Sequence, residues 1–268
     1  MPYIEREKGV RIHYNHYGHG FPLVFLHGFS ANAWLWVYQA PVLAHKYQCI
    51  VIEPRGHGLS SKPLKGYSIQ DMAADDAAVL AALGIDRAIL VGNSMGGMRA
   101  MQINLDYPHL VAGNVIISSA TNLTQFTTDA SELIASLRTD YEAAAEDMVA
   151  SCFSAKTRRE KPEVCQMIKN NFLNDEGFPR RVAMACLEDP NGVWNWNISD
   201  RLKEITQPTL VLVGEEDQAT PVAANRFLAE QIPGAELRVL KDVGHCYEIE
   251  QPLEFNHVLE EFVAKHGH

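Results

Sequence analysis

The apolar residues of this chain cluster in short continuous runs that end at glycine or at polar residues. Short runs rich in valine, isoleucine and leucine predict strands that are buried on both faces of a sheet. The segment 11–17 differs, because its apolar and polar residues alternate, which predicts a half-buried strand. The strands predicted in this way lie at 11–17, 22–26, 49–52, 88–91, 111–118, 208–213 and 235–240.

Between these runs, several segments have apolar residues about 3.6 positions apart, which is typical of amphipathic helices. Gly84 follows one of them and Pro108 lies just beyond another, and both residue types commonly mark helix ends. The helices predicted in this way lie at 33–43, 69–83, 95–106, 221–231 and 252–265. Strands that alternate with helices indicate right-handed βαβ units, so we predict the α/β fold class with a mainly parallel sheet.

One long interval, 121–197, breaks this alternation because it contains no good strand pattern. It is also too long to be a loop. Helical patterns occupy much of it, at 129–150, 159–173 and 180–187. We therefore predict a helical insertion, or cap, at 121–197, with a core formed by residues 1–120 and 198–268.

Composition narrows the class of protein. The chain has 268 residues, of which 47% are hydrophobic, enough for a sizeable core. Its net charge of −10 argues against a nucleic-acid partner and gives no reason to expect an anionic membrane. The N-terminus lacks the apolar region of a signal peptide, and no apolar stretch approaches the ~18 residues of a membrane span. We expect a cytoplasmic protein, either a monomer or a homodimer.

Metal and cofactor chemistry find little support in the sequence. The five cysteines are odd in number and form no C-x-x-C pair, which disfavours a disulfide framework or a zinc site. His13, His16 and His19 are spaced by three, so on a strand successive members point to opposite faces. We interpret them as surface residues. With no phosphate-binding or Rossmann glycine motif either, no cofactor and no metal is expected.

The segment 92–97, GNSMGG, places a serine between a predicted strand and a predicted helix. A sharp strand-to-helix turn lifts the Ser94 side chain above the edge of the sheet, and Gly92 and Gly96 let the backbone pass itself without Cβ clashes. The following helix directs its free N–H groups toward the serine, so the Met95 amide is a candidate oxyanion donor. Taken alone, the motif could also be a tight glycine-rich turn with an incidental serine.

Two later residues supply the partners that a serine nucleophile needs. Asp217 comes just after a buried strand, in GEEDQATP, and His245 lies in a loop after another strand, in VGHCYEIEQP. A serine hydroxyl attacks a carbonyl only when a base accepts its proton, and an acid that orients the base completes the triad. The chain order Ser94, Asp217, His245 is the order of the α/β-hydrolase arrangement.

Five segments together resemble the α/β-hydrolase-fold enzymes that carry a cap, and they span nearly the whole chain in the expected order. They are FLHGFS (25–30), EPRGHGLSS (53–61), GNSMGG (92–97), GEEDQATP (214–221) and VGHCYEIEQP (243–252). The resemblance implies a mainly parallel eight-stranded sheet flanked by helices. It also implies that the cap is inserted after the sixth strand of the family.

The resemblance assigns a role to each residue of the motif set. Ser94 corresponds to the nucleophile, Asp217 to the acid and His245 to the base. The turn after the family's third strand supplies the second oxyanion donor, which here is the backbone N–H of Phe29, with Met95 as the first. The Phe29 side chain would line the pocket.

Neighbouring residues leave alternatives open. Glu215 and Glu216 compete with Asp217 for the acid role, although the family pattern favours the aspartate. His27 is interpreted as a structural histidine bonded to nearby backbone. Arg55 and His57 are interpreted as bracing their loop rather than touching substrate.

Aromatic residues beside the turn and at the end of the cap are candidates for the substrate pocket. Trp194 and Trp196 lie at the end of the cap, and Trp34 follows the HGF turn. Each could form an apolar wall, or could instead anchor the cap onto the core, where aromatic burial is largest. The substrate-binding candidates are Phe29, Trp34, Asn93, Trp194 and Trp196.

The reaction class follows from which relatives the segments resemble. GNSMGG and WNISDRLKEI (196–205) resemble meta-cleavage-product hydrolases, which break C–C bonds, whereas the HGF turn resembles esterases and lactonases. Cys246 stands where the C–C hydrolases commonly have tryptophan, and no convincing cap arginine is present. The resemblance thus implies a small-molecule carboxylic ester or lactone as substrate and an acyl-enzyme route. The alternatives are a C–C hydrolase, a cofactor-free perhydrolase or lyase, and a receptor-like member with an idle triad.

Overall fold

A computed structural model describes residues 2–6, 9–126, 130–174 and 176–267. Its eight strands form one sheet in the order β1-β2-β4-β3-β5-β6-β7-β8. The β1–β2 and β2–β4 pairs are antiparallel and all other neighbours are parallel. The strands are β1 (Tyr3–Glu5), β2 (Arg11–Tyr17), β3 (Pro22–Leu26), β4 (Gln48–Ile52), β5 (Ala88–Asn93), β6 (Val111–Ile117), β7 (Thr209–Gly214) and β8 (Glu236–Leu240). The predicted α/β fold and mainly parallel sheet are confirmed.

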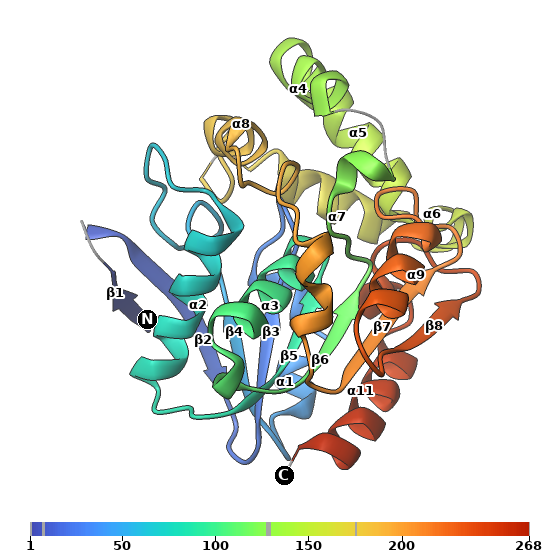
Figure 1. Cartoon of the computed structure of the whole chain (residues 1–268). Coiled ribbons are helices and arrows are strands. Elements are labelled where there is room, and N and C mark those ends of the chain that lie inside the picture. The colour runs from blue at the N-terminus through green and yellow to red at the C-terminus, as the bar shows by residue number, and fades with distance from the viewer. Residues whose placement is uncertain (1, 7–8, 127–129, 175, 268) are drawn as a thin grey trace.

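Helices cover both faces of the sheet (Figure 1). They are α1 (Ala40–Leu43), α2 (Ile69–Ala82), α3 (Met95–Asp106), α9 (Val222–Gln231), α10 (Tyr247–Glu250) and α11 (Pro252–His266). Along β3, Val24 and Leu26 pack in the cluster that contains residues of α2, α3 and α9, whereas Leu23 and Phe25 pack in the cluster that contains residues of α1, α10 and α11. This two-residue alternation explains why the buried strands are continuous apolar runs.

The carboxyl ends of the parallel strands bring distant segments together at one edge. Leu26 of β3 lies opposite Gly92 of β5 in the sheet. The turn that follows Leu26 and the turn that carries Ser94 therefore start from neighbouring positions. The loops after β7 and β8, which contain Asp217 and His245, leave the same edge because all four strands run in parallel.

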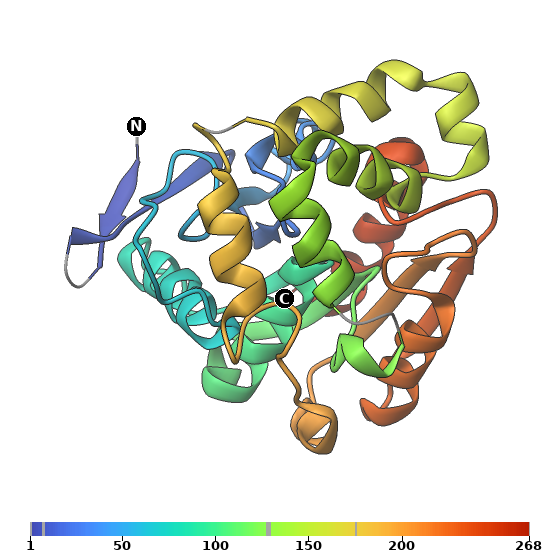
Figure 2. The same cartoon turned by 90° about the horizontal axis from the view of Figure 1, so that it is seen from above.

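The segment between β6 and β7 is helical and lies across this edge (Figures 1 and 2). Its helices are α4 (Ala130–Thr139), α5 (Tyr141–Cys152), α6 (Ala155–Glu160), α7 (Pro162–Phe172) and α8 (Arg180–Glu188). No strand occurs among its described residues. The division of the chain into a core and a cap at 121–197 stays a prediction, and "cap" denotes that segment below.

In the structure, three of the predicted helices are each divided into two shorter elements. The helix predicted at 129–150 is divided into α4 and α5 because Asp140 caps α5, accepting a hydrogen bond from Ala143 N; residue 129 lies outside the described residues. The helix predicted at 159–173 is divided because Pro162 starts α7. The segment 33–43 forms the 3₁₀-helix η2 (Ala33–Trp36) and the short α1, since Pro41 has no N–H for a continuous helix.

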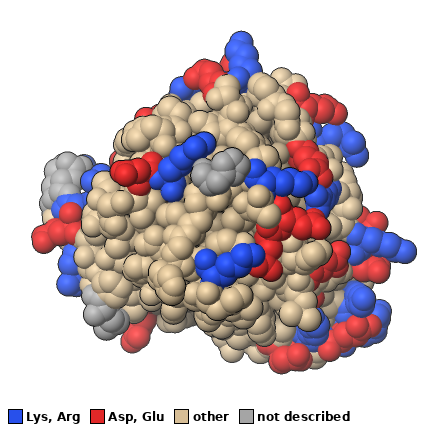
Figure 3. Space-filling model, turned by 90° about the horizontal axis from the view of Figure 1, so that it is seen from below, with Lys and Arg blue, Asp and Glu red and all other residues tan. Residues whose placement is uncertain are grey.

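The elements β1 and α10 and the 3₁₀-helices η3 (Pro108–Leu110), η4 (Leu123–Gln125) and η5 (Ser199–Glu204) were not predicted from the sequence. On the face opposite the cap, acidic and basic side chains are intermixed, mostly toward the rim, and much of the face carries neither (Figure 3). Its described residues therefore form no continuous basic surface on that face. Within the described residues, no helix is both long and apolar enough to cross a membrane.

Candidate active site

Ser94 lies at a strained turn between β5 and α3. Its backbone has φ +53° and ψ −118°, a conformation that L-residues rarely adopt. A Cβ on Gly92 would collide with the Gly96 carbonyl, and a Cβ on Gly96 would collide with the Leu26 carbonyl. The two glycines are therefore needed for this close backbone crossing, as the sequence predicted. The turn is fixed to the next strand by Ser94 N, which donates to Ile117 O at 2.9 Å.

Asp217 and His245 form a buried pair behind the serine. His245 Nδ1 lies 3.0 Å from both carboxylate oxygens of Asp217. The carboxylate also accepts hydrogen bonds from the N–H of Ala219 and from the N–H and hydroxyl of Thr220. Asp217 is therefore held in one orientation, and it can orient the imidazole through Nδ1, so that Nε2 is left for proton transfer.

The charge of Asp217 sets the proton affinity of His245. Burial by itself would lower the pKa of His245, but the neighbouring carboxylate and its hydrogen bonds raise it to about 9. The imidazolium form of His245 is thus stabilised in this pocket. A base that gains a proton during the reaction needs such stabilisation.

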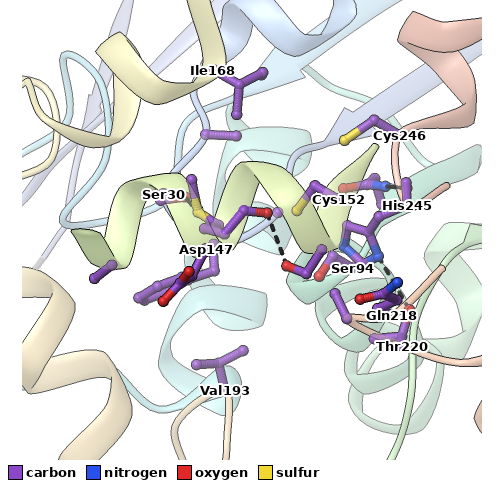
Figure 4. Close-up of a pocket in the computed structure, with 18 of the residues that line it drawn as sticks. Ser30, Ser94, Asp147, Cys152, Ile168, Val193, Gln218, Thr220, His245 and Cys246 are labelled. Atoms are coloured by element: carbon purple, nitrogen blue, oxygen red, sulfur yellow. Dashed lines mark hydrogen bonds between the residues drawn. The ribbon is translucent and has the colours of Figure 1, made fainter. Parts of the chain in front are cut away.

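Ser94 and His245 line the same cavity and lie beside each other (Figure 4). The Ser94 hydroxyl makes no hydrogen bond to His245 among the described residues. Hydrogen bonds between a nucleophile and its base are often long or poorly aligned until a substrate is bound. The arrangement thus places the three predicted triad residues at one site, with the Asp217–His245 hydrogen bonds formed.

Two backbone amides are available beside Ser94. Neither Phe29 N nor Met95 N donates a hydrogen bond to another described residue. Phe29 lines the cavity next to Ser94, and Met95 is the first residue of α3. An unpaired amide at this turn and another at a helix N-terminus match the requirement for an oxyanion hole.

The loop that carries His245 is positioned by polar side chains from other elements. Asn93 Nδ2 donates to His245 O at 3.0 Å, so this candidate substrate residue holds the histidine loop while it also lines the cavity. Thr220 Oγ1 lies 2.9 Å from Asp217 Oδ2 and 3.3 Å from His245 Nδ1. Thr220 was not among the predicted site residues, although its place three residues after the acid in a turn could have indicated a hydrogen bond.

The cavity beside Ser94 has a volume of about 440 Å³ and is lined by residues of both the core and the cap. Apolar side chains dominate its wall, including Met148, Ile168 and Val193 from the cap. Asp147 is the one carboxylate among its described lining residues, and no lysine or arginine lines it. The site is therefore suited to a neutral, partly apolar substrate.

The aromatic candidates have different positions. Trp194 and Phe29 line the cavity, as predicted. Trp196 lies outside it and is fully buried, where its indole Nε1 donates to Gln102 Oε1 at 2.9 Å. Trp34 also lies outside, beside a separate shallow depression. Trp196 and Trp34 therefore do not line the cavity that contains Ser94, and their contact with a substrate stays a prediction. Trp196 anchors the end of the cap to α3 because its large ring is buried there.

The segment 53–61, which follows β4, braces the site from outside the cavity. Arg55 forms a two-pronged ion pair with Asp75, with nitrogen–oxygen distances of 2.6 and 2.8 Å. His57 is fully buried and its Nδ1 lies 3.2 Å from Arg55 O. His27 is buried with its pKa lowered by burial to about 4, and it does not line the cavity. These three residues have the structural positions that we expected.

The carboxylate of Glu53 connects three segments next to the site, a role that the sequence did not predict. Its carboxylate accepts hydrogen bonds from Ala33 N, Leu59 N and His13 Nδ1, at 2.7 to 3.0 Å. It thereby joins the loop after β4 to η2 and to β2. The interpretation of His13 as a surface residue was wrong, because β2 pairs with β4 and places the ring beside the buried Glu53.

The segment 151–155, here called the cap junction, joins α5 and α6 to both loops of the acid–base pair. His245 N donates to Cys152 O at 2.7 Å. Ala155 N donates to Glu216 Oε2 at 2.8 Å, so Glu216 binds the cap, whereas the carboxylate that bonds to His245 is that of Asp217. This outcome favours Asp217 over its acidic neighbour as the partner of the histidine.

The fold, the strained serine turn and the buried acid–histidine pair define a hydrolase of the α/β class. The model of the alpha/beta hydrolase family matches residues 23–258. The chain belongs to this family.

Several characterised proteins are similar over almost the whole chain. The solved structure of Est816, an N-acyl homoserine lactone degrading enzyme, has a TM-score of 0.94 at 49% identity and covers 98% of this chain and 100% of that one. The 3-oxoadipate enol-lactonase 2 of Acinetobacter baylyi is 26% identical over 89% of this chain and 86% of the enzyme. The 2-hydroxy-6-oxononadienedioate/2-hydroxy-6-oxononatrienedioate hydrolase of Burkholderia vietnamiensis is 31% identical over 98% of this chain and 94% of the enzyme.

Proposed function

We propose that this hydrolase opens lactones and cleaves carboxylic esters through an acyl-enzyme on Ser94, and that N-acyl homoserine lactones are its favoured substrate class. The observation that carries the proposal is the 49% identity to Est816, with a TM-score of 0.94. Its family membership supports hydrolysis, and its similarity to an enol-lactonase supports a cyclic ester.

The chemistry follows from the positions of four groups. Ser94 Oγ attacks the lactone carbonyl while His245 Nε2 takes the hydroxyl proton. The amides of Phe29 and Met95 stabilise the oxyanion that forms. The ring C–O bond then breaks, and the imidazolium returns its proton to the leaving oxygen, which stays attached to the acyl group as a hydroxyl. A water molecule, deprotonated by His245, releases the hydroxy acid and regenerates Ser94.

The cavity wall supports a neutral substrate with an apolar tail. Met148, Ile168 and Val193 offer an apolar surface to an acyl chain, and the lining carries Asp147 but no described lysine or arginine. A substrate carboxylate would meet this negative charge without a compensating cation. The linear dienoates cleaved by C–C hydrolases carry such carboxylates, so the wall disfavours that alternative.

C–C bond hydrolysis is kept as the second candidate because of the 31% identity to the 2-hydroxy-6-oxononadienedioate/2-hydroxy-6-oxononatrienedioate hydrolase. It would use the same acid–base pair with a vinylogous diketone as substrate. Turnover of a dienoate ring-cleavage product without turnover of lactones would establish it and would refute the first proposal.

The test compares the wild type with Ser94→Ala on N-butanoyl and N-decanoyl homoserine lactone, p-nitrophenyl butyrate and a dienoate. Lactone opening releases a carboxylic acid, which a pH-stat records, and mass spectrometry identifies the hydroxy acid. We expect wild-type turnover of the lactones and the ester, and a loss of about 10³-fold or more in Ser94→Ala. Undiminished turnover by Ser94→Ala would refute the proposed mechanism, and wild-type turnover of the ester alone would refute the proposed substrate class.

A further inference from the structure

Two cysteines from distant parts of the chain meet beside His245. Cys152 ends α5 in the cap, and Cys246 directly follows His245 in the core. The backbones are in contact there, since His245 N donates to Cys152 O and a Cβ on Gly244 would lie 2.7 Å from the same oxygen. Both side chains line the cavity, on the same side as His245 (Figure 4).

This proximity affects the acidity of both thiols. The interaction with Cys246 is the largest cause that lowers the pKa of Cys152, against the effect of burial, and His245 lowers it further. The interaction with Cys152, together with burial, raises the pKa of Cys246 well above its usual value. Cys152 is thus the more acidic thiol of the two, and a pair of unequal thiols matches the roles of a reacting and a resolving cysteine.

The other three cysteines lack these properties. Burial raises the pKa of Cys49 to about 12 and raises that of Cys186 strongly. Cys165 also has a raised pKa, and none of the three lines the cavity. Small oxidants that enter the cavity would therefore meet Cys152 and Cys246 first.

We propose that Cys152 and Cys246 form a redox-active dithiol, a modification site for peroxides at the contact between the cap and the core. The Cys152 thiol loses its proton and the sulfur attacks one peroxide oxygen. The O–O bond breaks, the other oxygen leaves as hydroxide and takes up that proton to become water, and a sulfenic acid remains on Cys152. The Cys246 thiol then attacks the Cys152 sulfur, the S–O bond breaks and a second water leaves. The products are one disulfide and two waters, so two thiols are oxidised while one peroxide is reduced.

The disulfide would act on the proposed active site through the histidine loop. A disulfide requires its sulfurs to approach to about 2.05 Å, closer than any thiol contact. Its formation would pull the end of α5 against the residue that follows His245. Because displacements of about 1 Å near reacting groups can reduce rates up to ~10²-fold, we expect the esterase activity to fall about tenfold and to return on reduction.

The first experiment is chemical and does not depend on any catalytic activity. The full chain is treated with hydrogen peroxide, its free thiols are counted after denaturation, and its disulfide-linked peptides are mapped by mass spectrometry. We expect the five free thiols to fall to three, with one linkage between residues 152 and 246. A different linkage, oxidation confined to Cys165, or overoxidised Cys152 without a linkage would overturn the proposal.

Variants then separate the dithiol from other causes. Cys152→Ser and Cys246→Ser should each prevent the linkage, whereas the matched control Cys165→Ser should form it as the wild type does. Circular dichroism checks that each variant folds. If a variant does not fold, the peptide map of the oxidised wild type still tests the proposal. A linkage without any change in p-nitrophenyl butyrate turnover would refute the effect on activity but keep the modification site. Failure of the substrate proposal would leave the thiol count unaffected.

Discussion

Replacing Asp217 with asparagine removes the negative charge from the acid–base pair while it keeps the shape of the side chain. In the structure, both carboxylate oxygens lie 3.0 Å from His245 Nδ1. The carboxylate is the main group that raises the pKa of His245 to about 9, against the effect of burial. Without the charge, burial dominates and the pKa of His245 falls.

The size of the effect follows from this pKa. The difference between the ordinary histidine pKa of 6.5 and a value of about 9 corresponds to about 3 kcal/mol of preference for the imidazolium. The same charge stabilises the imidazolium that forms when His245 takes the serine proton. An asparagine can also stabilise the wrong tautomer, so we expect Asp217→Asn to lower kcat by about 10³- to 10⁴-fold.

The pH dependence of activity should differ between the wild type and Asp217→Asn. His245 acts as a base only when it is neutral, so wild-type kcat/KM should rise with pH until about pH 9. In Asp217→Asn, the rise should occur at lower pH. The stabilisation of the fold by protonated His245 is fully present below pH 6.5 and is lost as pH rises through about 9. Wild-type stability should therefore fall over this range more than that of the variant.

The assay measures p-nitrophenyl butyrate hydrolysis from pH 6 to 10, with the Ser94→Ala protein as the blank for alkaline hydrolysis. Glu216→Gln is the matched control, because Glu216 follows the same strand but binds Ala155 N of the cap. Its kcat and its pH profile should stay close to the wild type. Equal losses in Asp217→Asn and Glu216→Gln, or an unchanged pH profile in Asp217→Asn, would refute the assignment of the acid.

Three further predictions concern the packing around the site. Asp76→Asn leaves the fully buried Arg99 without its ion-pair partner, so the free energy of unfolding should fall by about 3–5 kcal/mol. Thermal denaturation measures the change, and an unchanged Tm would contradict this prediction. Trp196→Phe removes the hydrogen bond to Gln102 and should lower that free energy by about 1–2 kcal/mol in urea unfolding, whereas equal stability would show that the bond does not anchor the cap. Asp147→Asn should raise the ratio of kcat/KM for an anionic ester to kcat/KM for p-nitrophenyl butyrate by about fivefold, because about 1 kcal/mol of repulsion is lost. An unchanged ratio would show that Asp147 does not repel anionic substrates.

The sheet could be predicted from the sequence because its signals are local. The buried strands are continuous apolar runs, and the turns at their carboxyl ends contain glycine and the candidate residues in a fixed order. Since parallel strands share one edge, the positions of Ser94, Asp217 and His245 just after three of these strands, together with the family resemblance, placed them at one site. The divisions at Asp140 and Pro162 were also encoded locally, but the helical periodicity masked them.

The wall of the site could not be predicted in the same way. Trp194 and Trp196 are two residues apart and look equivalent in the sequence, yet one lines the cavity and the other is buried against α3. Which one faces the cavity depends on how the cap packs on the core, and no local pattern specifies that. The contact of Cys152 with His245 has the same origin, because it joins residues far apart in the chain.

The cap junction has a consequence for how such enzymes diversify. Cys152 O and Ala155 N are the partners of His245 N and of the Glu216 carboxylate, so a short piece of the insertion completes the hydrogen bonding of the core. A chimaera that exchanges the whole insertion for that of another family member would keep these core groups paired only where the new backbone follows the same course at 151–155. Recombination that exchanges the helices on either side but retains 151–155 would alter the substrate pocket and preserve the support of the histidine loop.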